Sequence, residues 1–156
     1  MAVIEIKKET PNNINELVKM ADDKTNWRKR LEAVNELKNW KCQKSRDVLT
    51  RLAMHDLVFK VKEEALRATQ SLGITKNGKR LKLGKPKVHL IKDINKKLYN
   101  VDNEINESFE ITKFKEKFKQ LYPEPYDVYE GDKGNSFDEW ILSVLKNKPK
   151  SKPANK

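Results

Sequence analysis

A stretch rich in lysine and arginine, in the middle of the chain, is the strongest chemical feature of the sequence. Residues 74–100 carry nine basic side chains and one acidic one, a net charge of +8. The densest part contains Lys76, Lys79, Arg80, Lys82, Lys85 and Lys87. On an exposed turn, these cations would contact about three to six phosphates, in a salt-sensitive way that does not read base sequence. The alternative is a solvated connector whose lysines maintain solubility. Residues 76–87 contain no aromatic residue and therefore offer no surface for base stacking.

Other residue types capable of chemistry do not form a recognisable site. His55 and His89 lie far apart with no Cys or His cluster, so zinc ligation is not predicted. Cys42 has no recognisable partner and is interpreted as a packed or idle thiol. The C-terminal third contains five clustered acids: Asp127, Glu130, Asp132, Asp138 and Glu139. Their spacing does not follow a calcium loop. We therefore predict no catalytic residue, no metal and no cofactor, and expect a non-enzymatic protein.

The composition argues against a disulfide-stabilised, membrane-spanning or secreted protein. The 156 residues are 37% apolar and 37% charged, with a net charge of +11. Residues 101–147 oppose this trend, with six basic and eleven acidic side chains. A single cysteine excludes an internal disulfide framework. No apolar run approaches the ~20 residues that cross a bilayer, and the first residues lack a secretory pattern. We expect a cytoplasmic protein without a membrane partner.

The first half of the chain repeats itself at an offset of 32 residues. This offset pairs residues of like chemistry in two blocks: Leu17 with Leu49, Met20 with Leu52, Ala21 with Ala53, Trp27 with Phe59, Arg30 with Lys62, Glu32 with Glu64, Ala33 with Ala65 and Val34 with Leu66. Apolar residues within the blocks recur at steps of three and four, which is typical of one face of an α-helix. Helices are predicted over residues 12–22, 26–39, 45–55 and 57–72. Pro11 suits the first turn of the first helix, Ser45 is a predicted N-cap, and Gly73 is a predicted C-terminal cap.

These two blocks resemble HEAT-type α-solenoid repeats over residues 14–73. The resemblance lies in the helix that contains Trp27, Arg30 and Ala33, and in the pattern H-D-x-x-x-x-V-K-x-x-A that begins at His55. It implies that Asp56 lies in a turn and that the basic residue after Val61 is structural. HEAT proteins are mostly scaffolds that bind other proteins, and a few bind or repair DNA. The resemblance therefore implies a binding surface more strongly than a reaction.

The repeat stops after Gly73. Asn77-Gly78 is a strong tight-turn pattern, so residues 74–87 are predicted to be a basic, hairpin-like connector rather than a further helix. Hydrophobic spacing then predicts helices over residues 88–99 and 109–121. A third helix is expected to begin at Ser136, which forms a capping box with Glu139. Residues 122–135 are read as a loop whose tyrosines either pack over the core or dock a peptide. This 14-residue gap is too long for a helix-turn-helix.

The sequence thus predicts an all-α protein in which a short HEAT-like α-solenoid precedes a small C-terminal helical subdomain. We assign residues 1–73 to the repeats, 74–87 to the connector, 88–148 to the subdomain and 149–156 to a flexible tail. The subdomain is expected to cover the open end of the solenoid with two apolar faces. These faces are formed by Phe114 with Phe118 and by Trp140 with Val144.

Function is predicted in two classes. The first is a non-enzymatic scaffold or adaptor that binds another protein, of unknown identity, through its HEAT-like surface. The alternative is a protein that binds DNA or RNA through a shared basic stripe. The stripe would contain Arg28, Lys29, Arg30, Lys60, Lys62, Lys79, Arg80 and Lys82. A third class, resembling the HEAT-like alkylpurine DNA glycosylases, is disfavoured because the acidic and aromatic site residues of those enzymes have no match in this chain.

Overall fold

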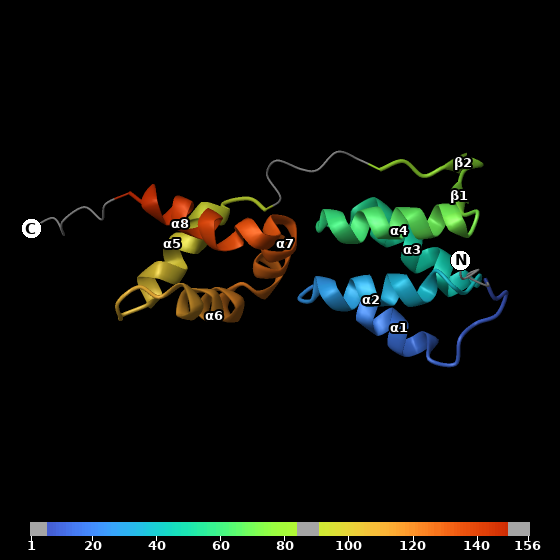
Figure 1. The fold of residues 1–156 in the computed structure, drawn as a ribbon, viewed down its shortest axis with the longest axis horizontal. Helices are drawn as coiled ribbons and strands as arrows, with labels where there is room; N and C mark the ends of the chain where they lie inside the picture. Colours follow the sequence, from blue (N-terminus) through green and yellow to red (C-terminus); the bar gives the residue numbers. More distant parts are fainter. Residues whose placement is uncertain (1–5, 84–90, 150–156) are drawn as a thin grey trace, which may run out of the picture. The chain divides into compact units, whose positions relative to one another are not determined.

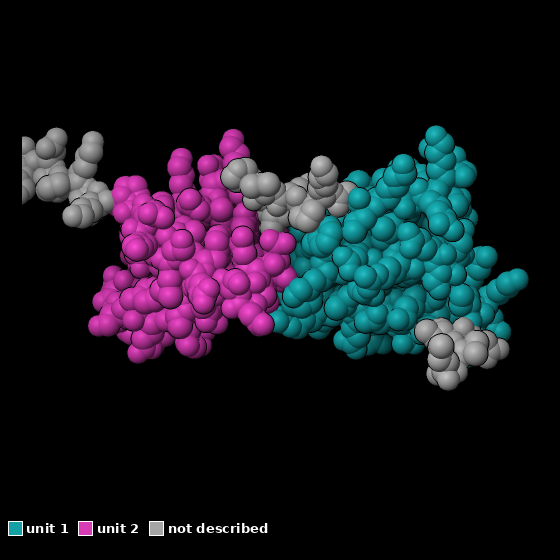
Figure 2. Space-filling view, turned by 45° about the horizontal axis from the view of Figure 1, so that its top comes forward, with its two compact units in different colours: residues 1–90 teal, residues 91–156 magenta. Residues whose placement is uncertain are grey.

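The computed structural model describes residues 6–83 and 91–149, and the described elements confirm the all-α class (Figure 1). The chain divides into two compact units (Figure 2). Unit 1 contains residues 1–90 and unit 2 contains residues 91–156. The basic connector that follows the repeats therefore belongs to unit 1.

Unit 1 contains the four helices that hydrophobic spacing predicts. They are α1 (Ile14–Ala21), α2 (Trp27–Leu37), α3 (Gln43–His55) and α4 (Phe59–Ser71). Their ends differ from the predicted ends by about two residues, the usual uncertainty of helix boundaries. The prediction of four helices is confirmed.

The helices of unit 1 pack as two hairpins placed side by side. Helix α1 packs against α2, α3 packs against α4, and α2 lies along α4. Four of the pairs matched at the 32-residue offset are buried in both members: Leu17 with Leu49, Ala21 with Ala53, Ala33 with Ala65 and Val34 with Leu66. In two other pairs, Trp27 and Arg30 are buried, whereas Phe59 and Lys62 are only partly buried. Two hairpins define a single stacking step and no superhelix, so the HEAT-like solenoid remains a prediction.

Local interactions explain where these helices begin and end. The Asn26 side chain accepts a hydrogen bond from the Lys29 N–H (3.1 Å) and so caps α2. At the end of α4, the Ile74 and Gly73 N–H groups donate to the carbonyls of Thr69 and Gln70, at 2.8 and 3.1 Å. This is a Schellman motif with Gly73 in the left-handed region (φ +68°), and it confirms the predicted glycine cap.

The predicted N-cap of α3 is wrong. Helix α3 begins two residues earlier than Ser45, and Cys42 occupies the N-cap position. Ser45 is fully buried in the first turn, and its hydroxyl lies 3.4 Å from the Cys42 thiol. The Ser45 hydroxyl therefore contacts the side chain of the N-cap residue and is not itself at the N-cap position.

A two-stranded hairpin follows α4, as the Asn-Gly pair predicts. Strands β1 (Thr75–Lys76) and β2 (Lys79–Arg80) are antiparallel. Asn77 and Gly78 both have positive φ, +53° and +75°, as a type I′ turn requires. The flanking residues Ile74 and Leu81 are buried in the core of unit 1. The hairpin is thus fixed at its base, while its strands remain outside the core.

Unit 2 contains α5 (Ile94–Glu104), α6 (Ile111–Leu121), α7 (Pro123–Lys133), a short 3-10 turn η1 (Gly134–Ser136) and α8 (Phe137–Lys146). The second and third predicted helices correspond to α6 and α8. The first begins later than the predicted residue 88, because Asp93 adopts a left-handed conformation (φ +59°) immediately before Ile94. Residues 88–90 lie outside the described part of the chain. The capping box is also wrong, since the Ser136 side chain makes no capping hydrogen bond and belongs to the preceding 3-10 turn.

The predicted loop over residues 122–135 is mostly a helix. Pro123 and Pro125 fall in the first turn of α7, where backbone N–H groups have no intrahelical partner, so the missing donors cost little. Tyr126 and Tyr129 pack over the core, which was one of the two predicted alternatives. The ring of Tyr126 lies 5.3 Å from that of Phe118, and the ring of Tyr129 stacks on Trp140 at 4.6 Å.

Aromatic rings fill the core of unit 2. Phe114 and Phe118 are fully buried, and the Phe118 ring lies 6.2 Å from Phe137. Trp140 stacks within the same unit. The faces formed by Phe114 with Phe118 and by Trp140 with Val144 were predicted to cover the open end of the N-terminal hairpins. That prediction is wrong for Phe114 and Phe118, because they are used in the core of their own unit.

Candidate nucleic-acid interface

The eight cations of the predicted basic stripe do not form one continuous group. Four of them lie near the starts of α2 and α4: Arg28, Lys29, Lys60 and Lys62. Three belong to the hairpin or follow it: Lys79, Arg80 and Lys82. The hairpin lies beyond the C-terminal end of α4, so α4 separates these two groups (Figure 1). Arg30, the eighth residue, is buried.

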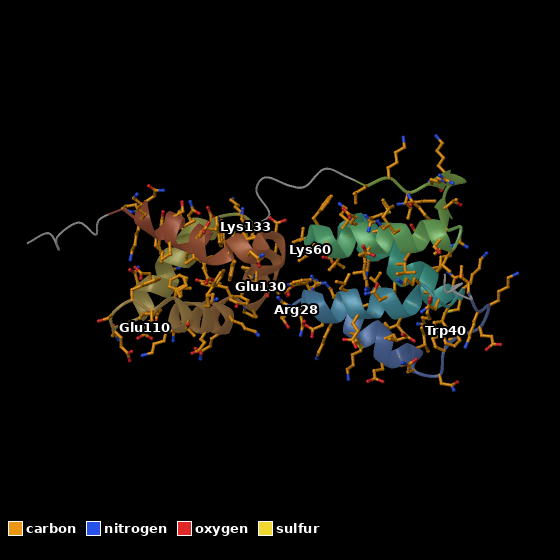
Figure 3. All side chains as sticks on the ribbon, viewed as in Figure 1. Arg28, Trp40, Lys60, Glu110, Glu130 and Lys133 are labelled. Atoms are coloured by element: carbon orange, nitrogen blue, oxygen red, sulfur yellow. The ribbon has the colours of Figure 1, made fainter. Side chains whose placement is uncertain are left out.

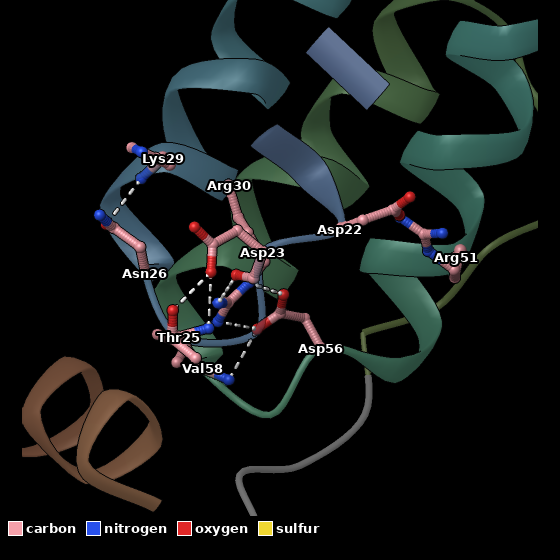
Figure 4. Close-up of polar contacts among 9 residues, drawn as sticks. All are labelled: Asp22, Asp23, Thr25, Asn26, Lys29, Arg30, Arg51, Asp56 and Val58. Carbon is pink, nitrogen blue, oxygen red and sulfur yellow. Dashed lines mark hydrogen bonds and ion pairs between the residues drawn. The ribbon is translucent and has the colours of Figure 1, made fainter. Parts of the chain in front are cut away.

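Arg30 is part of a buried polar network (Figure 4). Its Nε and Nη2 donate to the two carboxylate oxygens of Asp56, at 2.8 and 3.3 Å, and its Nη1 donates to the Asp23 carbonyl at 2.7 Å. The Asp56 carboxylate also accepts the Val58 N–H at 2.8 Å. A guanidinium enclosed in this way cannot bind a phosphate, so Arg30 is removed from the candidate interface. Its role is to join α2 to the turn between α3 and α4.

Asp23 adds a local turn beside this network. The Thr25 hydroxyl and N–H both donate to Asp23 Oδ1, at 2.6 and 2.9 Å. These hydrogen bonds, first the one from the hydroxyl, hold the pKa of Asp23 below its ordinary value. The ionised carboxylate thereby fixes the connection between α1 and α2, which carries Arg30 into position.

Two cations of the first group lie over the ring of Trp27 at the start of α2. The Arg28 guanidinium lies 4.4 Å and the Lys60 ammonium 5.3 Å from the Trp27 ring. Figure 3 labels Arg28 and Lys60 at the matching ends of α2 and α4. Neither helix has an acidic residue in its first turn. Cations are unfavourable near helix N-termini, and the electron-rich face of Trp27 offsets part of that cost.

The hairpin group differs in having no acidic residue near it in the sequence. Lys79, Arg80 and Lys82 are exposed and form no ion pair with any residue that the structure describes. The sequence contains no acid between Glu64 and Asp93. Lys76 points back over α3, with its Nζ 3.6 Å from Met54 Sδ. Lys85 and Lys87 lie outside the described residues. The hairpin therefore presents at least three unneutralised cations to solvent.

Sequence reasoning missed a second basic feature, which centres on Trp40. The Lys7 N–H donates to the Asn39 carbonyl at 2.9 Å, and the Lys41 N–H donates to the Lys7 carbonyl at 2.7 Å. These bonds form an isolated parallel bridge between Lys7 and Trp40. Lys41 and Lys44, which follow Trp40 in the sequence, are both exposed. The lysines near Trp40 are visible in the sequence, but the contact with Lys7 depends on the fold.

The remaining candidate groups stay isolated. Burial acts to raise the pKa of the Cys42 thiol, but hydrogen bonds with Ser45, Thr10 and Lys44 together outweigh it and hold the pKa below its ordinary value. His55 is exposed, and His89 lies outside the described residues. In residues 6–83 and 91–149, no three His, Cys, Asp or Glu side chains are grouped as metal ligands would be. No helix in the same ranges has the length and apolar character needed to cross a membrane.

Among the features described, the hairpin cations are the best candidate for an interface with a polyanion. Comparisons of the chain with protein-family models, with curated proteins and with solved structures found no match.

Proposed function

We propose that this chain is a non-enzymatic protein that binds nucleic acid, with the basic hairpin of unit 1 as its main contact and a HEAT-like pair of helical hairpins as its scaffold. The observation that carries the proposal is the state of Lys79, Arg80 and Lys82. All three are exposed, and none is paired with an acid among the described residues. A phosphate backbone is the polyanion that such a group suits best.

The proposed mode of binding is electrostatic. Each neutralised phosphate releases condensed counterions, so the logarithm of the binding constant falls with the logarithm of salt by about 0.9 per contact on a duplex and about 0.7 on a single strand. Three hairpin cations would contribute a slope of roughly −2 to −3. Such contacts position the nucleic acid without reading its bases.

The scaffold supports this mode by holding the hairpin in place. Ile74 and Leu81 lie on either side of the two strands and are both buried in the core of unit 1. The cations therefore extend from a fixed base, which reduces the conformational entropy lost on binding. The matched burial of Ala33 and Ala65 supports the repeat relationship on which the HEAT-like interpretation depends.

Fluorescence anisotropy with oligonucleotides of mixed sequence tests the proposal. The full chain is titrated from about 0.05 to about 0.3 M salt, as wild type and with Lys79, Arg80 and Lys82 changed together to alanine. We expect the triple variant to bind roughly tenfold or more weakly, with the salt slope reduced by about 2 to 3.

A matched control removes three charges elsewhere. Lys24, Lys96 and Lys146 are also exposed, and their joint change to alanine lowers the net charge by the same amount. Because they lie outside the hairpin, we expect their loss to weaken binding less than about threefold. Equal losses in the two variants would contradict a localised site. Absence of binding by the wild type at low salt would contradict the proposal and favour the protein-binding adaptor that the HEAT resemblance implies.

A further inference from the structure

We propose that Trp40 is a stacking platform for a nucleotide base, and that the nucleic acid bound by unit 1 is therefore single-stranded. This inference rests on the proposed function and specifies its substrate class. An indole ring accepts any base on its face, because every base has a π-face, and such stacking does not require a particular sequence. In a duplex, the faces of the bases are already stacked on one another.

The backbone holds Trp40 rigidly. The residues on either side of it are both hydrogen-bonded to Lys7, through the Asn39 carbonyl at 2.9 Å and the Lys41 N–H at 2.7 Å. Trp40 follows the last turn of α2, and its own N–H donates to the Leu37 carbonyl at 3.0 Å. The ring thus extends from a segment with a fixed conformation. A preorganised aromatic surface loses little entropy when a base stacks on it.

The surroundings of Trp40 distinguish it from the other two tryptophans. Trp27 is 9% exposed, with Arg28 and Lys60 over its ring. Trp140 is stacked on Tyr129, with the ring planes only 5° apart. Trp40 is half-exposed, and its described ring neighbour is the ammonium of Lys7, 5.0 Å from the ring centroid.

Lys7 is a replaceable cover. Its side chain is exposed and flexible, so a base can take its place over the ring while the ammonium turns to the adjoining phosphate. The Lys7 ammonium then loses its cation–π contact with Trp40 but gains a charge-assisted hydrogen bond to a phosphate. Its environment therefore stays favourable. Lys41 and Lys44 are exposed nearby and form no ion pair with the residues described. They can neutralise the next phosphates.

The topology of unit 1 brings Trp40 to the same end as the basic hairpin. A three-residue connection joins α3 to α4, and the two helices pack together, so they are antiparallel and α3 begins where α4 ends. Trp40 lies shortly before α3, and the hairpin follows α4. Figure 1 places β1, β2 and the end of α2 at this end of unit 1, and Figure 3 labels Trp40 there. One strand can therefore contact Trp40 and then the hairpin.

The experiment compares three ligands of equal length on the full chain: a single strand of mixed sequence, the corresponding duplex and a single strand of abasic sugar-phosphate. We expect the wild type to prefer the single strand to both others by roughly tenfold, the effect of one stacked base. Trp40→Ala should bind the normal single strand about tenfold more weakly and bind the abasic strand as the wild type does. Trp40→Phe should recover most of the lost affinity.

Controls separate this inference from the proposed function. Trp140→Phe changes an aromatic residue in unit 2 and should bind the single strand like the wild type. Circular dichroism establishes that each variant keeps its helices. If Trp40→Ala binds the single strand as tightly as the wild type, or if the wild type binds the duplex or the abasic strand equally well, base stacking is overturned, while hairpin-dependent binding still stands. If the wild type binds none of the three ligands, both proposals are overturned.

Discussion

The Asp56 carboxylate of unit 1 is held by both a side chain and the backbone. Its side chain is 3% exposed, and it accepts two hydrogen bonds from Arg30 and one from the Val58 N–H. The planar guanidinium matches a carboxylate in two places at once, which an ammonium cannot do. Removal of the carboxylate would leave a buried cation and a buried N–H without their acceptor. That loss is costly because neither group regains water.

Asp56→Ala is therefore expected to lower the free energy of unfolding by about 3 kcal/mol, in the range observed when one partner of a buried ion pair is lost. Urea denaturation followed by circular dichroism measures this change. Asp22→Ala is the matched control, since Asp22 pairs with Arg51 and both side chains are nearly half exposed. We expect it to cost less than about 1 kcal/mol. Similar losses for the two variants would show that burial does not strengthen the role of Asp56.

The burial of Arg30 and its ion pair with Asp56 could not be predicted from the repeat pattern. Arg30 and Lys62 occupy matched positions, but Arg30 is buried and Lys62 is half-buried. The difference arises because the acceptor has no repeat: the position matched to Asp56 at the 32-residue offset is Lys24. A pattern that equates the two repeats predicts equal roles for their cations, whereas the ion pair joins one repeat to the other. Only the packing of α2 against α4 reveals it.

At the scale of elements, the end of α4 depends on one residue. Gly73 has φ +68°, and a Cβ added there would meet no atom within 4 Å. A substitution at this position is therefore costly for its backbone conformation alone. Gly73→Ala should lower the free energy of unfolding by about 1 kcal/mol, and Gly73→Asn by less, because asparagine adopts the left-handed region more readily. Urea denaturation of both variants measures the difference, and equal stability of all three proteins would contradict the account.

Elements with regular apolar spacing could be predicted, and those without it could not. The steps of three and four in α2 and α4 follow directly from packing against the other helices of unit 1. Helix α7 was not predicted, because Pro123, Pro125 and Gly131 give this segment the composition of a loop. The prolines are tolerated because they occupy the first turn, and this position is known only once the start of the helix is known.

At the scale of the whole molecule, the candidate interface is only partly visible in the sequence. The hairpin could be predicted because Asn77-Gly78 fixes a local turn, and local turns need no knowledge of the fold. Trp40 could not be assigned to it. Lys7 precedes Trp40 by 33 residues, and the hairpin follows it by about the same number. These segments lie at the same end of unit 1 because α3 and α4 pack antiparallel, which is a tertiary property.

The division into two units predicts that stability and binding can be changed separately. Phe118 is fully buried, and its ring lies 5.3 Å from Tyr126 and 6.2 Å from Phe137, all within unit 2. Phe118→Ala should lower the stability of unit 2 by about 3–5 kcal/mol, since it removes a large ring and leaves a cavity. Unit 1 has its own core, so its stability should change little.

Residue-resolved hydrogen exchange of the Phe118→Ala variant measures both effects at once. In unit 2, the amides of α5, α6, α7 and α8 should exchange faster, in proportion to the increased population of the unfolded unit. In unit 1, the amides of α1, α2, α3 and α4 should keep their exchange rates. Leu49→Ala is the reciprocal control, because Leu49 is fully buried in the core of unit 1. Faster exchange in both units for either variant would mean that the two cores unfold together. Because the hairpin and Trp40 belong to unit 1, Phe118→Ala should still bind a single strand with wild-type affinity.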